Sequence, residues 1–537
     1  MSVLPLPNSK LLVALIGAGV PAAYALYRIL SGKSRSALRF LPGPPRTSGP
    51  WLLGDVPALV KEEDTAMFER WVATYGPTLR CHGLFGSFVL YTMDDKALQH
   101  VLSHPEVYEK GPGVRKMLTR VVGPGLLVVE GQQHRQQRKI MNPAFGPAHI
   151  RVLTPIFLGK AAELRDIWLS QVDASGCARV DALNWLSKCT LDIISLAGFN
   201  YPLNSLASSG EDENELASAF ETIFTAESDT SGSSLVRDIL PMLRLYKTAT
   251  DRKVARAQAT MLRVGKELME ESKRECESVG GRKDLLSLLI RANTAKEVPE
   301  SQRMADEDVI AQIPTFLVAG HETSSTAVSW ALFELAQHPE MQTRLRAELL
   351  AVPVDEPSAE TLNSLKYLDF VVRETLRLHS PVRSTSRVAM RDDVVPLAEP
   401  FTDATGKRHD SLIITKGEYV FIPILTMNRA ERLWGEDAKR FMPDRWEHTP
   451  VATAGIPGVW DHSLTFLGGP RGCIGYRFAL DEIKAILFTL VRAFVFELGV
   501  PASDIGEKST PIVKRPIVLS EMEKGTQLPL VVRPVSV

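Results

Sequence analysis

The chain has 537 residues, of which 45% are hydrophobic and 23% charged, so it can bury one very large core or two domains and is neither disordered nor fibrous. Its formal net charge of -1 gives no overall field that would attract DNA or RNA. The five cysteines are odd in number and form no C-x-x-C pair, which argues against a disulfide framework or a zinc site and fits a reducing compartment.

An uncharged, mostly apolar run lies near the start of the chain. Leu11 to Tyr27 would form about 26 Å of helix at ~1.5 Å per residue, and extension to Leu30 approaches the ~30 Å core of a bilayer. Basic residues follow the run, which places the body of the protein in the cytosol and argues against a cleaved signal peptide. We therefore expect a single-pass membrane anchor over residues 1–32, although Pro21 leaves open a helix that lies on the membrane surface.

The next segments predict a hinge and a small sheet. Residues 33–48 are basic and rich in proline, and Leu41 to Pro45 cannot continue a helix, so we expect a stiff extended spacer. Thr78 to Leu84 and Phe88 to Thr92 flank a Gly-Ser pair and predict a hairpin. Helical patterns dominate from there almost to the end of the chain. The expected fold class is mainly α with small β-sheets.

The longest helical pattern runs from Asp306 to Gln337. It has acidic residues at its start and His338-Pro339 at its end, and it would be roughly 48 Å long at ~1.5 Å per residue. Pro314 and Gly320 lie inside it, where they cost about 3 and 1 kcal/mol relative to alanine. We interpret them as the sign of a local opening in the helix.

A glycine-rich loop from Phe466 to Gly475 presents one cysteine, Cys473, and a helical pattern follows at once. Its glycines allow positive φ angles and a close approach of the backbone to a flat group. The helix that follows directs the positive end of its dipole at the sulfur. This arrangement predicts a thiolate at Cys473.

Five residues of this loop carry a family resemblance: Phe466, Gly469, Arg471, Cys473 and Gly475 match F-x-x-G-x-R-x-C-x-G. The chain thereby resembles the cytochrome P-450 monooxygenases, for which this pattern is the heme-binding signature. The resemblance implies heme b with its iron bound axially by Cys473, and Arg471 as a partner of a heme propionate. It also implies one large catalytic domain over residues 49–537.

Other segments match the family in the expected order. Ala319 to Ser324 matches A-G-x-D/E-T-T/S, which implies that Thr323 acts in the dioxygen pocket and that Glu322 feeds a proton relay. Arg138 matches the propionate-binding arginine of W-x-x-x-R, with His134 in place of the tryptophan. Arg387 matches a propionate-binding arginine at the end of a predicted strand, Val382 to Ala389.

Glu374 and Arg377 are three residues apart and share one face of a predicted helix. Such a pair is usually solvated, but apolar neighbours indicate burial here, and a buried pair needs a third partner. The resemblance supplies Arg445, which matches the arginine of F-x-P-x-R-F/W. We expect these three residues to form a structural triad rather than a catalytic group.

The resemblance implies a heme-thiolate monooxygenase on the endoplasmic reticulum membrane with its catalytic domain in the cytosol. Electrons would come from NADPH through a separate NADPH-cytochrome P-450 reductase, because the chain has no nicotinamide or flavin fingerprint such as G-x-G-x-x-G. The expected substrate is a lipophilic small molecule, such as a terpenoid secondary metabolite. A fatty acid or xenobiotic hydroxylase, a heme-thiolate isomerase or dehydratase, and a heme-binding sensor or carrier are the alternatives. The adjacent Glu322 and Thr323 favour the monooxygenase.

Overall fold

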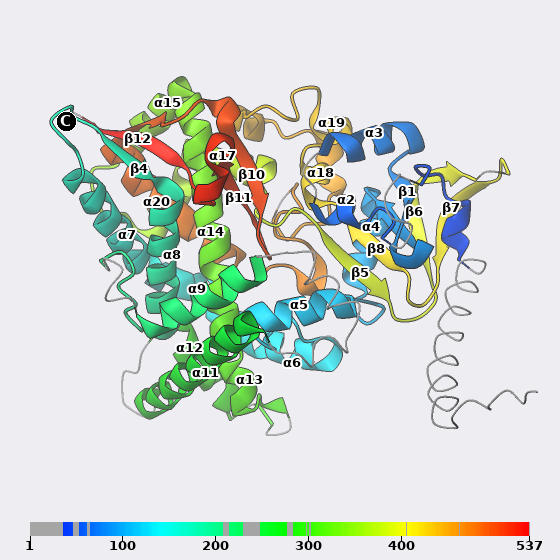
Figure 1. Cartoon of the computed structure of the whole chain (residues 1–537), viewed down its shortest axis with the longest axis horizontal. Helices are drawn as coiled ribbons and strands as arrows, with labels where there is room; N and C mark the ends of the chain where they lie inside the picture. The colour runs from blue at the N-terminus through cyan, green and yellow to red at the C-terminus, as the bar shows by residue number, and fades with distance from the viewer. Residues whose placement is uncertain are drawn as a thin grey trace, which may run out of the picture. The chain divides into compact units, whose positions relative to one another are not determined.

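The computed structural model describes residues 36–46, 53–61, 65–207, 214–228, 248–276, 283–296, 298–299, 302–403, 405–460 and 462–535 (Figure 1). The expected anchor, residues 1–32, lies outside these ranges. Among the helices that the structure describes, none has the length and apolar character needed to cross a membrane. Contacts divide the chain into two units, the first formed by Met1–Glu109 with Ser384–Pro423 and the second by Lys110–Arg383 with Ile424–Val537.

The first unit is built on a five-stranded sheet in the order β1-β2-β8-β5-β3. The predicted hairpin is confirmed: β1 (Thr78–His82) and β2 (Phe88–Thr92) pair antiparallel. The other strands are β3 (Tyr108–Glu109), β5 (Thr385–Ala389) and β8 (Tyr419–Ile422). Phe68, Tyr91 and Phe421 stack with ring centroids 5.5 to 6.2 Å apart, which gives the unit an aromatic core.

The described part of the proline-rich segment contacts the sheet of the first unit. Leu41 is buried, and the carbonyl of Pro42 accepts a hydrogen bond from the backbone N–H of Arg80 in β1 at 2.9 Å. A side chain at Gly43 would collide with the Arg80 carbonyl. The segment is therefore docked on the edge of the sheet. The unit also contains η1 (Ala37–Phe40), α2 (Val56–Lys61), α3 (Thr65–Tyr75), η2 (Leu84–Gly86), α4 (Asp95–Ser103) and the hairpin of β6 (Asp393–Thr402) with β7 (Arg408–Ile414).

The second unit is mainly helical and is organised around α14 (Gln312–Gln337), which packs against α8 (Ala182–Phe199) and α20 (Tyr476–Ala493) (Figure 1). Its other helices are α5 (Pro112–Val122), α6 (Gly131–Met141), α7 (Pro147–Ser170), α9 (Glu215–Ser228), α11 (Ala249–Cys276), α12 (Leu285–Thr294), α13 (Asp306–Ile310), α15 (Pro339–Leu350), α16 (Ala359–Ser364), α17 (Lys366–Leu378), α18 (Ile424–Asn428) and α19 (Glu431–Trp434). Short 3-10 turns are η3 (Asn142–Phe145), η6 (Pro443–Glu447), η7 (Val451–Gly455), η8 (Gly469–Arg471), η9 (Ala502–Asp504) and η10 (Leu519–Lys524).

Two small sheets complete the second unit. β4 (Ala178–Asp181), β12 (Pro529–Pro534) and β9 (Phe494–Leu498) form one, and β10 (Ile505–Ser509) with β11 (Lys514–Val518) forms the other. The prediction of a mainly α fold with small β-sheets is thus confirmed for the described residues.

The long helix predicted from Asp306 to Gln337 is interrupted at Ala311, between α13 and α14. The predicted local opening is wrong, because α14 is continuous through Pro314 and Gly320. A Cβ atom on Gly320 would lie 2.7 Å from Cγ1 of Ile194 in α8. The glycine therefore permits the close approach of the two helices instead of widening one of them.

A buried carboxyl lies where α20 packs on its neighbours. Glu482 is fully buried, and neither of its carboxyl oxygens has a partner in hydrogen-bonding geometry. Burial raises the pKa of Glu482 to about 8, although the nearby Ser324 hydroxyl of α14 lowers it in part. Glu482 is therefore neutral at pH 7.

The raised pKa of Glu482 predicts a pH-dependent stability. An unfolded glutamate has a pKa of ~4.3, so the folded chain binds this proton more tightly and loses stability as the pH rises from ~4.3 to about 8. We expect the free energy of unfolding to fall more steeply over this interval in the wild type than in Glu482→Gln, by up to about 1.4 kcal/mol per pH unit. Denaturant titrations at several pH values measure this difference. Glu497→Gln, on the exposed side of β9, serves as control, and parallel profiles for wild type and Glu482→Gln would refute the prediction.

Candidate active site

The cysteine loop is a tight turn that ends at the start of α20. The backbone N–H of Cys473 donates to the carbonyl of Phe466 at 2.8 Å, and that of Gly472 donates to Gly469 at 3.0 Å. The backbone N–H of Gly475 donates to the Cys473 sulfur. α20 begins at the next residue, Tyr476. The loop thus holds the sulfur at the N-terminal end of a helix of 18 residues.

The glycines of this loop work differently from the prediction. Only Gly469 has a positive φ, of 68°, whereas Gly468, Gly472 and Gly475 have φ angles of -130°, -58° and -91°. Gly468 and Gly472 are needed for close packing instead. A Cβ on Gly468 would collide with a backbone carbonyl, and one on Gly472 would lie 2.6 Å from Val459.

The Cys473 side chain is exposed, yet burial raises the pKa of its thiol. The sulfur is therefore accessible at its surface, while the protein atoms around it still desolvate it. The Gly475 amide and the Arg138 charge lower this pKa, but they do not outweigh desolvation. The helix dipole alone therefore does not make the predicted thiolate. A bound metal ion would convert the thiol to a thiolate, because coordination deprotonates a thiol.

One strip of α14 is accessible although most of the helix is buried. Ala319 is exposed and Thr323 is partly exposed, one turn apart on the same face, whereas Val318 and Glu322 are buried. The hydroxyl of Thr323 donates to the Ala319 carbonyl at 2.6 Å. This strip presents a methyl group and one hydroxyl to an open space.

Glu322 does not belong to the accessible strip. Its carboxylate is 1% exposed and is paired with Arg515 of β11, whose Nε lies 3.0 Å from Oε2, and with His321 at 3.0 Å. These two partners hold the pKa of Glu322 below its usual range in spite of burial. Arg515 follows 193 residues later in the chain, and no motif marked it.

Two predicted propionate partners lie beside the cysteine loop. Nη1 of Arg138 in α6 donates to the Gly472 carbonyl at 2.5 Å. Arg471 donates to the Val129 carbonyl at 3.2 Å and forms an ion pair with Glu130, which the sequence did not single out. His134 is buried on α6. Arg387 lies in β5 of the first unit, where it is buried.

Comparison with known proteins adds the decisive observation. The family model described as Cytochrome P450 matches residues 42–519. The chain belongs to the cytochrome P450 family. Cytochrome P450 monooxygenases 205 and 128 of Postia placenta are 51% and 49% identical to it, over 93% and 95% of both chains. Cytochrome P450 monooxygenase claO of Ampulloclitocybe clavipes is 37% identical over 88% of this chain and 89% of its own.

Membership makes this chain a P450 monooxygenase with a heme whose iron is bound by cysteine. The residues of the second unit fit that group. The Cys473 sulfur is accessible, Arg138 and Arg471 provide positive charge near it, and the Phe145 ring, 3.7 Å from where a Cβ of residue 475 would lie, adds an apolar surface. These are the donors and surfaces that an anionic, flat cofactor with a thiolate ligand requires.

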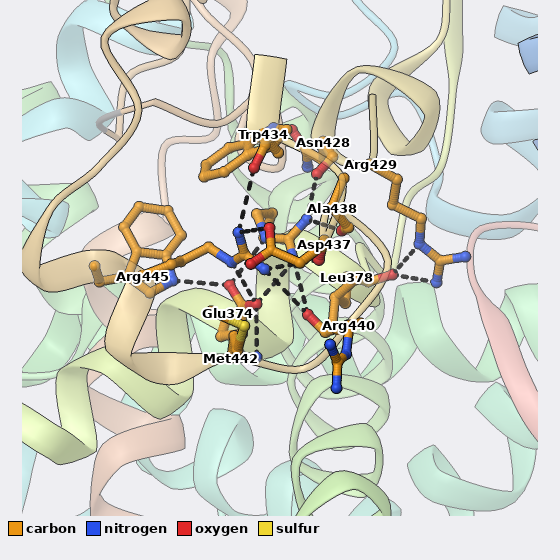
Figure 2. Close-up of polar contacts among 12 residues, drawn as sticks. Glu374, Leu378, Asn428, Arg429, Trp434, Asp437, Ala438, Arg440, Met442 and Arg445 are labelled. Carbon is orange, nitrogen blue, oxygen red and sulfur yellow. Dashed lines mark hydrogen bonds and ion pairs between the residues drawn. The ribbon is translucent and has the colours of Figure 1, made fainter. Parts of the chain in front are cut away.

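Glu374, Arg377 and Arg445 are brought together in a buried cluster (Figure 2). The carboxylate of Glu374 accepts from Nε and Nη2 of Arg377 at 2.9 and 2.8 Å, and from Nε of Arg445 at 2.9 Å. The Trp446 indole N–H and the Met442 backbone N–H also donate to it, at 3.0 and 2.9 Å. One buried carboxylate thus accepts five hydrogen bonds.

The two arginines extend the cluster into the segment after α18. Arg377 donates to the carbonyls of Asn428 and Ala438 at 2.8 and 2.5 Å, and Arg445 donates to the Asp437 carboxylate at 2.9 Å (Figure 2). Sequence reasoning missed Asn428. Its side chain donates to the Thr465 hydroxyl at 2.8 Å and accepts from Leu464 N–H at 3.0 Å, so it joins the cluster to the start of the cysteine loop.

Glu374→Gln tests the weight of this cluster. The change removes the only carboxylate that Arg377 contacts in the described structure and leaves buried guanidinium charge without compensation, which costs about 3–5 kcal/mol. We expect a lower unfolding midpoint and loss of heme during purification, measured by denaturation and by heme content per chain. Glu447→Gln breaks an exposed pair with Lys366 and should change neither. Wild-type stability and heme content in Glu374→Gln would refute a structural role.

Proposed function

We propose that this cytochrome P450 oxidises a lipophilic small molecule, of the secondary-metabolite type such as a terpenoid, with dioxygen and with electrons from NADPH. The accessible strip of Ala319 and Thr323 in an otherwise buried helix is the observation that carries the proposal. It combines an apolar wall for a substrate with a single hydroxyl. Kinship with proteins named cytochrome P450 monooxygenases supports the reaction class.

The proposal assigns each site residue a role. Cys473 would hold the heme iron through its sulfur, and the heme, once bound, would supply the chemistry of dioxygen activation. Glu374, Arg377 and Arg445 fix the segment that leads to the cysteine loop. The residues proposed to line or bind the heme are Arg138, Arg387, Phe466, Gly469, Arg471 and Gly475.

Thr323 and Glu322 are proposed to deliver protons. The Thr323 hydroxyl is anchored on the Ala319 carbonyl at 2.6 Å, so its oxygen is held toward the accessible space with a lone pair left for a water molecule. Glu322 is ionised and lies next to it in sequence. Release of Glu322 from Arg515 would raise the pKa of its carboxylate, so that it could take up a proton and pass it on.

The proposal includes a membrane anchor and a separate electron donor. Residues 1–32 anchor the chain in the endoplasmic reticulum membrane by a single pass, residues 33–48 form the hinge, and residues 49–537 form the cytosolic catalytic domain. A separate NADPH-cytochrome P450 reductase supplies the electrons. The apolar run from Leu11 to Tyr27, the basic residues after it, and the lack of a nicotinamide or flavin fingerprint support this arrangement.

Thr323→Ala tests the monooxygenase role. The change removes the hydroxyl and leaves Cys473 untouched, so heme content and carbon monoxide binding persist. The share of NADPH that ends in product should fall by about tenfold or more, and hydrogen peroxide should rise, because positioned proton transfer contributes ~10²–10⁴ in rate. Peroxide and product per NADPH, measured with reductase and a substrate that supports turnover, give the result.

Ser329→Ala is the matched control, because Ser329 makes the same hydroxyl-to-carbonyl bond in α14, to Ser325 at 2.7 Å, but is fully buried. Its coupling should equal that of the wild type. Unchanged coupling in Thr323→Ala would remove Thr323 from the mechanism. Product formation without consumption of oxygen or NADPH would instead favour an isomerase or dehydratase.

A further inference from the structure

Four charged side chains form a cluster beside the cysteine loop: Lys110, Glu130, Arg138 and Arg471. Glu130 is ion-paired with Arg471, and both side chains are at most 5% exposed. Oε1 of Glu130 accepts the backbone N–H of Lys110 at 3.1 Å and lies 3.8 Å from its ammonium group. Nη1 of Arg138 donates to the carbonyl of Gly472, the residue that follows Arg471, so Arg138 reaches the same turn of the loop.

Glu130 lies at the N-terminal end of α6, but its carboxylate contacts this cluster instead of capping the helix. It precedes the first residue of α6, a position where a side chain usually accepts from the N–H groups of the first helical turn. Glu130 makes no such hydrogen bond. Its carboxylate turns to Arg471 and Lys110 instead, so it connects the start of α6 with the cysteine loop.

The charges of these four side chains suit the proposed cofactor. Three cations and one anion leave a net charge of two positive, which matches the two propionates of a heme. Without the Glu130 carboxylate the cluster would carry three positive charges among largely buried side chains, where each charge acts more strongly than in water. An additional positive charge near the iron would favour the reduced form.

We propose that Glu130 is a positioning residue of the heme site: it holds Arg471 and Lys110 in place, and its charge lowers the reduction potential of the iron. The inference rests on the proposed function, because it takes the Cys473 loop as the heme site. Glu130 acts through its two cationic partners and has no contact of its own with the reaction.

Redox titration of the heme-loaded full chain tests this role. Glu130→Gln should shift the ferric–ferrous equilibrium toward the ferrous state by about tenfold, which is 59 mV for a one-electron couple. Glu130→Asp keeps the charge and should stay near the wild-type potential. Asp192→Asn is the matched control, because Asp192 is an equally buried carboxylate with a lysine partner and two backbone donors, but in α8. A merely structural residue would not move the potential.

Lys110→Gln gives a test of opposite sign, since it removes a positive charge and should shift the equilibrium toward the ferric state. If Glu130→Gln does not retain heme, the potential of Lys110→Gln tests whether the charges of this cluster act on the iron. Potentials equal to that of the wild type in the heme-retaining variants would overturn the role of Glu130. A wild type whose reduced carbon monoxide spectrum shows no thiolate ligand would instead overturn the proposed function.

Discussion

The buried carboxylate of Glu374 is the interaction on which the rest of the site depends. Between α18 and α20 the described chain has only short helical turns, so its position is fixed by polar contacts rather than by regular structure. Glu374 compensates two buried arginines, and these bind the carbonyls and the carboxylate of that segment. Asn428 carries the connection on to Leu464 and Thr465, immediately before Phe466. The position of Cys473 thus follows from a charge buried in α17.

α14 forms a second part of the site, a rigid helix with one accessible strip. Gly320 permits close contact with Ile194 of α8, and the hydroxyl of Thr315 donates to the Val122 carbonyl at 2.9 Å. These contacts hold the helix from both sides. In the middle of the helix the face of Ala319, Gly320 and Thr323 stays accessible, and its polar side-chain group, the Thr323 hydroxyl, is fixed by its bond to the Ala319 carbonyl.

Local patterns in the sequence predicted the hairpin of β1 and β2, the mainly helical fold and the loop around Cys473. These local patterns could not predict contacts between residues that are far apart in the chain. Arg515 binds Glu322, which lies 193 residues earlier in the chain, and Glu130 binds Arg471, which lies more than 300 residues later. Neither Arg515 nor Glu130 belongs to a motif. Gly320 was misinterpreted because a glycine in a helix favours either an opening or a close contact, and only the position of Ile194 decides between them. The state of the Cys473 thiol depends on desolvation, which no local pattern reports.

The central claim is that Cys473 binds the heme iron as a thiolate. The carbon monoxide difference spectrum of the reduced full chain tests it most directly, with Cys473→Ser and, as control, Cys177→Ser, whose sulfur lies next to Ser175, before β4. The account predicts the red-shifted Soret band of a heme-thiolate in the wild type and in Cys177→Ser, and its loss in Cys473→Ser. A spectrum like that of a histidine-ligated heme in the wild type, or an unchanged red-shifted band in Cys473→Ser, would contradict it.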